Sequence, residues 1–68
     1  MKIYENYKDT IKEWSNILTG KYGTIFRIYS GDMETLKIWS RGLTKIYGKP
    51  FALKSNPSDT LEEWSKLI

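Results

Sequence analysis

Residues 35–40 read Thr35-Leu36-Lys37-Ile38-Trp39-Ser40, and the chain contains two further versions of this stretch. Thr10-Ile11-Lys12-Glu13-Trp14-Ser15 lies 25 residues earlier, and Thr60-Leu61-Glu62-Glu63-Trp64-Ser65 lies 25 residues later. A repeat of this period predicts one structural unit used three times. We divide the chain into units 1–23, 24–48 and 49–68. We expect them to form a single domain, 1–68, because a chain this short supplies one core at most.

The apolar residues of each unit recur at helical spacing. In the middle unit Leu36, Trp39, Leu43 and Tyr47 follow one another at steps of three, four and four residues, which places them on one side of an α-helix. The first unit has the same steps, and so does the third as far as the chain extends. The sequence therefore predicts three amphipathic helices, at about 7–22, 32–47 and 57–68.

Cap residues mark the predicted helix ends. Asn6, Gly31 and Asn56 occupy equivalent positions before the three helical patterns, and all three residues are acceptable N-caps. Gly23 and Gly48 follow the first two patterns, where a left-handed C-terminal cap favours glycine.

Short segments before the helices have the composition of strands. Residues 24–29 are β-branched and aromatic, residues 50–54 are a weaker match, and residues 2–4 form only a stub. Alternation predicts two faces. One face carries Met1, Ile3, Phe26, Ile28, Phe51 and Leu53. The other face carries Lys2, Tyr4, Arg27, Tyr29, Ala52 and Lys54.

The order strand–helix, used three times, predicts an α/β fold. Its sheet has three parallel strands with all the helices on one face, because repeated crossovers share one hand. One alternative pairs the strands antiparallel in an α+β arrangement, and another treats the short segments as loops of a three-helix bundle. A parallel sheet is usually covered on both faces, so an open face predicts a partner or a dimer.

The predicted core combines the helix stripes with the apolar strand face. We assign the three tryptophans to this core rather than to ligand stacking, because they lie on the stripes. The core residues are Ile11, Trp14, Leu18, Tyr22, Phe26, Ile28, Leu36, Trp39, Leu43, Tyr47, Phe51, Leu53, Leu61, Trp64 and Ile68.

The middle unit departs from its siblings at three helix positions. Ile38 replaces a glutamate, Ile46 replaces a lysine, and Gly42 lies in the middle of the helix. We attribute the isoleucines to a helix with a neighbour on each side. A glycine inside a helix costs about 1 kcal/mol relative to alanine, so we expect close helix packing at Gly42 as the compensation.

The composition argues against catalysis. The chain contains no histidine and no cysteine, which excludes disulfides, Cys/His zinc sites and the common nucleophile–base pairs. Asp9, Glu34 and Asp59 lie in predicted first turns, where the helix dipole favours acids. No P-loop or dinucleotide motif is present. We expect a protein that is not an enzyme and has no catalytic residue, metal, cofactor or small-molecule substrate.

The sequence predicts a cytoplasmic location and no membrane partner. No apolar stretch approaches the roughly 18–20 residues of a membrane span. Charged residues interrupt the N-terminal segment, which does not resemble a signal peptide.

The candidate binding residues are Lys2, Tyr4, Arg27, Tyr29 and Lys54, which lie on the open sheet face and are basic or aromatic. Because tyrosine and arginine are common interface anchors, we expect a small interaction protein that acts through protein–protein association, including self-association into a homo-oligomer. One alternative is nucleic-acid binding, in which bases stack on the tyrosines and the cations hold phosphates. The gap-free repeat also allows a designed or reconstructed protein without a natural function.

Overall fold

The computed structural model describes residues 1–68 and contains three α-helices. α1 covers Tyr7–Tyr22, α2 covers Asp32–Tyr47 and α3 covers Pro57–Ser65, with one 3₁₀ turn, η1, at Thr24–Phe26. The first two helices have the predicted bounds, whereas α3 ends three residues before the predicted end at residue 68. No strand is present, so the predicted α/β fold with a parallel sheet is wrong, and so is the antiparallel alternative. The three-helix alternative fits.

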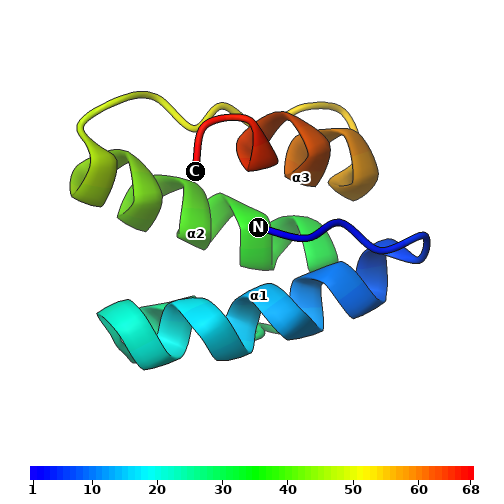
Figure 1. Cartoon of the computed structure of the whole chain (residues 1–68), viewed down its shortest axis with the longest axis horizontal. Helices are drawn as coiled ribbons and strands as arrows, with labels where there is room; N and C mark the ends of the chain where they lie inside the picture. Colours follow the sequence, from blue (N-terminus) through cyan, green and yellow to red (C-terminus); the bar gives the residue numbers. More distant parts are fainter.

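All three helices run in the same direction (Figure 1). The first turns of α1 and α2 are joined by an ion pair between Lys8 Nζ and Asp32 Oδ2 at 3.4 Å. Their last turns are joined by a 3.0 Å hydrogen bond between the hydroxyls of Tyr22 and Tyr47. α3 contacts both other helices. Each connection therefore returns the chain from the end of one helix to the start of the next. The N-terminal segment crosses the view between α1 and α3 (Figure 1).

The predicted N-caps are confirmed. Asn6 Oδ1 accepts a hydrogen bond from Lys8 N at 2.9 Å, and Asn56 Oδ1 accepts one from Asp59 N at 2.8 Å. Each asparagine satisfies an N–H group that the start of a helix leaves without a partner. Gly31 is the N-cap of α2 and contributes no side-chain bond.

The two glycines at the helix ends both have positive φ, but only one is in the left-handed helical region. Gly48 has φ 70° and ψ 22°, which confirms the predicted left-handed cap of α2. Gly23 has φ 116° and ψ 179°, and it leads directly into η1. Each glycine N–H donates to a threonine carbonyl one turn earlier, Thr19 O at 3.0 Å and Thr44 O at 2.9 Å.

The extended segments form no sheet because side chains from the helices occupy their backbone groups. Each tryptophan donates its indole N–H to a carbonyl 12 residues earlier in the chain. The three bonds are Trp14 Nε1 to Lys2 O at 2.8 Å, Trp39 Nε1 to Arg27 O at 3.1 Å and Trp64 Nε1 to Ala52 O at 2.9 Å. A buried indole N–H needs an acceptor, and these carbonyls supply it.

A threonine in the first turn of each helix binds the same extended segment, two residues after the carbonyl that the tryptophan binds. Its Oγ1 accepts from a backbone N–H, which is the group that a sheet neighbour would otherwise bind. The three bonds are Tyr4 N to Thr10 Oγ1 at 2.8 Å, Tyr29 N to Thr35 Oγ1 at 2.9 Å and Lys54 N to Thr60 Oγ1 at 3.0 Å. Each extended segment therefore lies with its backbone edge, rather than a face of side chains, against its own helix.

The core contains ten buried apolar side chains, all at positions where the sequence predicts core residues. They are Ile11, Trp14, Leu18, Phe26, Leu36, Trp39, Leu43, Phe51, Leu61 and Trp64. Tyr47 and Ile68 pack against this cluster and are partly buried.

Three other predicted core residues are exposed. Tyr22, Ile28 and Leu53 are 36%, 47% and 38% exposed. The predicted alternation of Ile28 and Leu53 is wrong because their segments lie edge-on to the helices. Ile3, at the equivalent position of the first unit, is 40% exposed for the same reason.

Phe26 fills the space between α1 and α2. Its ring centroid lies 5.9 Å from that of Tyr22 and 6.2 Å from that of Trp39. Phe51 makes the equivalent contacts one unit later, at 5.5 and 5.9 Å. A Cβ placed on Gly42 would lie 3.0 Å from Phe26 Cζ. The expected close approach at Gly42 is therefore present, but its partner is the Phe26 ring of η1 and not a neighbouring helix.

Candidate binding surface

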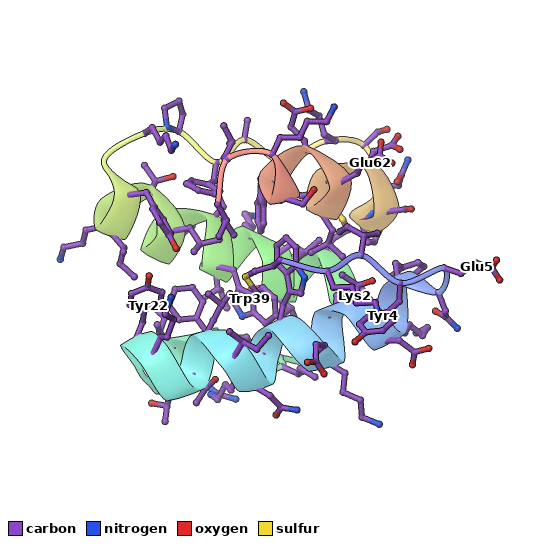
Figure 2. All side chains as sticks on the ribbon, viewed as in Figure 1. Lys2, Tyr4, Glu5, Tyr22, Trp39 and Glu62 are labelled. Atoms are coloured by element: carbon purple, nitrogen blue, oxygen red, sulfur yellow. The ribbon has the colours of Figure 1, made fainter.

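The five predicted binding residues do not form one surface, because they lie on three separate connections. Lys2 and Tyr4 lie on the N-terminal segment (Figure 2), with Lys2 Nζ 5.0 Å from the centroid of the Tyr4 ring. Arg27 and Tyr29 form a second pair on the connection between α1 and α2, with Arg27 Cζ 4.1 Å from the ring centroid. Lys54 lies on the connection before α3. In place of the predicted sheet face, the five residues therefore form two separate cation–aromatic pairs and one isolated lysine.

The outer side of α2 differs from the equivalent sides of its sibling helices. Ile38 stands where both siblings have glutamate, and Ile46 stands where α1 has Lys21. Ile38 is half-buried, but Ile46 is 42% exposed. A helix neighbour on each side, which the sequence suggests, does not explain Ile46, since much of this side chain meets solvent. An apolar side chain that the fold leaves uncovered is one mark of an interaction site.

A third isoleucine adjoins these two. Ile25 lies over Gly42, with Ile25 Cδ1 3.7 Å from the place of a Cβ on that glycine. Gly42 is four residues from both Ile38 and Ile46, so these two isoleucines lie on one ridge of α2, and Ile25 of η1 lies over the glycine between them. Ile25 is itself 45% exposed. The hydroxyl of Tyr29 donates to Ile25 O at 2.9 Å and holds the ring against this connection.

Three basic residues lie along the next ridge of α2. Lys37, Arg41 and Lys45 follow one another at intervals of four residues and are all exposed. Arg41 lies three residues from Ile38, so the basic ridge borders the isoleucines. The one ion pair of the molecule joins the starts of α1 and α2 and involves none of these bases. They are therefore available to an acidic partner.

We call this combined surface the α2 face. It comprises Ile25, Arg27, Tyr29, Lys37, Ile38, Arg41, Lys45 and Ile46. Only Arg27 and Tyr29 belong to the binding set that the sequence predicts. In the sequence, Ile38 and Ile46 stand out only because they differ from the equivalent residues of the other units. That difference predicts packing against neighbouring helices and not a binding surface.

A shallow hollow lies between the starts of α1 and α2. Its volume is about 260 Å³, and it is lined by Lys8, Asp9, Ile11, Lys12, Ile28 and Asp32. Two lysines and two aspartates balance one another, so the hollow offers no excess charge that would select an ion. Nowhere in the chain do three or more carboxylates gather as metal ligands.

The tyrosine pair at the opposite end of α1 and α2 contains a perturbed titratable group. The hydrogen bond with Tyr22 raises the pKa of Tyr47 above its ordinary value, and partial burial and the coulombic interaction with Tyr22 raise it further. The raised pKa favours the neutral form of Tyr47, and the pair has the character of a structural contact between helix ends.

Comparisons with protein family models, with curated proteins and with solved structures found no match. No helix has the length and apolar character needed to cross a lipid bilayer. Among the chain's own surfaces, the α2 face combines exposed apolar side chains with basic residues that form no ion pair.

Proposed function

We propose that this chain is a small non-catalytic binding protein that associates with another protein through the α2 face. The observation that carries the proposal is the exposure of Ile25 and Ile46, at 45% and 42%, beside bases without acidic partners. The repeat supplies an internal comparison, because α1 and α3 fold with a glutamate at the place of Ile38, and α1 folds with Lys21 at the place of Ile46. These isoleucines are therefore not required by the fold of a unit.

The chemistry of the α2 face indicates the kind of partner. Isoleucines beside arginine, lysine and tyrosine match an amphipathic segment that carries acidic residues next to apolar ones. Arg27 stacks over Tyr29, and arginine and tyrosine are among the residues that contribute most to interfaces. A nucleic-acid backbone would contact the lysine and arginine side chains through its phosphates and leave the isoleucines exposed to water. We therefore favour a protein partner over a nucleic acid. The cytoplasmic location expected from the sequence stays a prediction.

Binding of a fluorescent acidic amphipathic helical peptide, followed by anisotropy, tests the proposal. The variants give α2 the residues of its siblings, as Ile38→Glu and Ile46→Lys. We expect each to weaken binding about tenfold, since burying one aliphatic side chain contributes about 1.5–3 kcal/mol. Ile17→Lys is the matched control, because Ile17 is 39% exposed on α1 and lies outside the α2 face. Equal loss in all three variants, or no binding by the natural chain, would overturn the proposal.

Oligonucleotides distinguish the nucleic-acid alternative. Single- and double-stranded probes are titrated at low and high salt, because phosphate contacts give a steep salt dependence. The protein-binding proposal fails if three results occur together: the oligonucleotides bind with such a salt dependence, Arg41→Glu abolishes that binding, and the peptide does not bind. The α2 face would then be a nucleic-acid-binding surface.

A further inference from the structure

The outer side of α3 carries the opposite charge to the α2 face. Glu62 takes the place that Lys37 has in α2, and Glu63 takes the place of Ile38. Glu62 is exposed and Glu63 is half-buried (Figure 2 labels Glu62). Neither glutamate forms an ion pair within the chain. The exposed Lys66 takes the place of Arg41, so the acidic patch on α3 ends at Glu63. One molecule thus carries a basic ridge on α2 and an acidic patch on α3, and no ion pair joins the two.

We infer that the partner of the α2 face is the outer side of α3 in a second copy of this chain. This inference rests on the proposed function and names its occupant. Glu62 and Glu63 of one copy meet Lys37 and Arg41 of the next, and opposite charges across an interface fix its register. Leu67, one turn after Glu63, packs against the core of its own copy, and only its exposed part can add to the contact.

A symmetric pairing of two α2 faces is disfavoured, because it would place the ridge of Lys37, Arg41 and Lys45 against its own copy. Like charges directly opposite one another repel. The contact therefore joins two different surfaces. Such a heterologous contact leaves one free surface at each end, so assembly continues beyond the dimer as concentration rises.

The contact is expected to be weak. A stable interface buries about 800 Å² per partner, whereas the whole chain exposes 4294 Å² and one helix side is a small part of it. We expect dissociation constants on the order of 100 µM, and a loss of association in high salt because charge pairs at a surface are screened.

Sedimentation velocity between about 10 µM and 1 mM tests the inference. In low salt the natural chain is expected to form species that grow past the dimer, and to return to monomer near 0.5 M salt. Two neutralised variants give the sharper result. Lys37→Gln/Arg41→Gln loses only the basic surface, and Glu62→Gln/Glu63→Gln loses only the acidic one. Each alone is expected to stay monomeric, with circular dichroism confirming its fold. Their equimolar mixture is expected to form dimers and nothing larger, because only one complementary contact remains.

A natural chain that stays monomeric at 1 mM in low salt overturns the inference, and so does a mixture that does not form dimers. Assembly that stops at a dimer in the natural chain also overturns it, since this indicates a symmetric contact. These results are distinct from failure of the proposed function. A monomeric chain whose α2 face still binds the acidic peptide refutes self-association alone, whereas loss of both refutes the proposed function as well.

Discussion

Thr19 and Thr44 occupy equivalent positions in α1 and α2, but only one of their hydroxyls has a hydrogen-bond partner. Thr44 Oγ1 accepts from Phe51 N at 3.1 Å. Thr19 Oγ1 is buried without a partner, because Phe26 N donates instead to Gly23 O within η1. An unpaired buried hydroxyl costs about 1–3 kcal/mol. We therefore predict that Thr19→Val leaves the free energy of unfolding unchanged or raises it.

Thr44→Val is the matched variant, and it should lower that free energy by about 1–3 kcal/mol, because it removes the acceptor of the Phe51 N–H. Urea unfolding of both variants measures the difference. Equal effects at the two sites would show that η1 does not satisfy the Phe26 N–H in place of Thr19.

Gly42 and Gly20 both lie inside helices, and their surroundings predict opposite effects of alanine. Nothing lies within 4 Å of a Cβ placed on Gly20, so Gly20→Ala should stabilise the protein by up to about 1 kcal/mol. A Cβ on Gly42 meets Phe26 Cζ at 3.0 Å and Cε1 at 3.4 Å, and that ring is fully buried. Overpacking costs about 1–3 kcal/mol, which exceeds the gain in helix propensity. Gly42→Ala should therefore lower the melting temperature, and a rise at both sites would show that the Phe26 ring yields freely.

At the scale of the elements, the helices were predictable and the segments between them were not. Stripes such as Leu36, Trp39 and Leu43 define a helix by their spacing alone. An extended segment has the same alternation whether its backbone pairs with a strand or with side chains. The donors are the indole of Trp39 and its siblings, and the acceptors are threonines such as Thr35, at the helix starts. The stripes predict that the tryptophans are buried, but they do not show which group accepts the indole N–H. The acceptors are backbone carbonyls of the extended segments, and these carbonyls are then not free to pair with another strand.

The absence of a sheet also explains why the predicted binding residues do not share one surface. Lys2, Arg27 and Lys54 share one surface only if a sheet joins their segments, and without it they separate. The α2 face was visible in the sequence as the departure of Ile38 and Ile46 from their sibling residues. Whether such isoleucines are covered by a neighbouring helix or meet solvent depends on tertiary packing, which the repeat pattern does not contain.

The last turns of α1 and α2 meet through the tyrosine pair, and this contact should depend on pH. The pKa of Tyr47 is raised in the folded state, chiefly by its hydrogen bond with Tyr22. A group with a raised folded pKa contributes stability that is fully present below its unfolded value of 10.0 and is lost as pH rises through the folded pKa. We predict that the difference in free energy of unfolding between the natural chain and Tyr22→Phe narrows from pH 9 to pH 11. Tyr7→Phe, away from the pair, provides the control, and a constant difference for Tyr22→Phe would contradict the assignment.

At the scale of the whole molecule, the three units surround one core, and the last unit lies beside the start of the first. Met1 occupies the position in the repeat that Phe26 and Phe51 have in later units, and Met1, Leu67 and Ile68 all pack against the one core. The N-terminal segment crosses between α1 and α3 as the other connections join successive helices (Figure 1). In the register of the repeat, a segment equivalent to residues 44–50 would join Ile68 to Met1.

A second copy of residues 44–50 should therefore close the chain into a ring without strain. Joining Ile68 to Met1 through this segment removes conformational freedom from the unfolded chain, so we predict a higher melting temperature for the cyclic protein. The control is the linear chain with the same seven residues added after Ile68, which adds the same contacts without closure. A shift of several degrees is expected for a domain of this size if closure contributes about 1 kcal/mol. A cyclic protein that melts below the linear control would show that the ends do not meet in the register of the repeat.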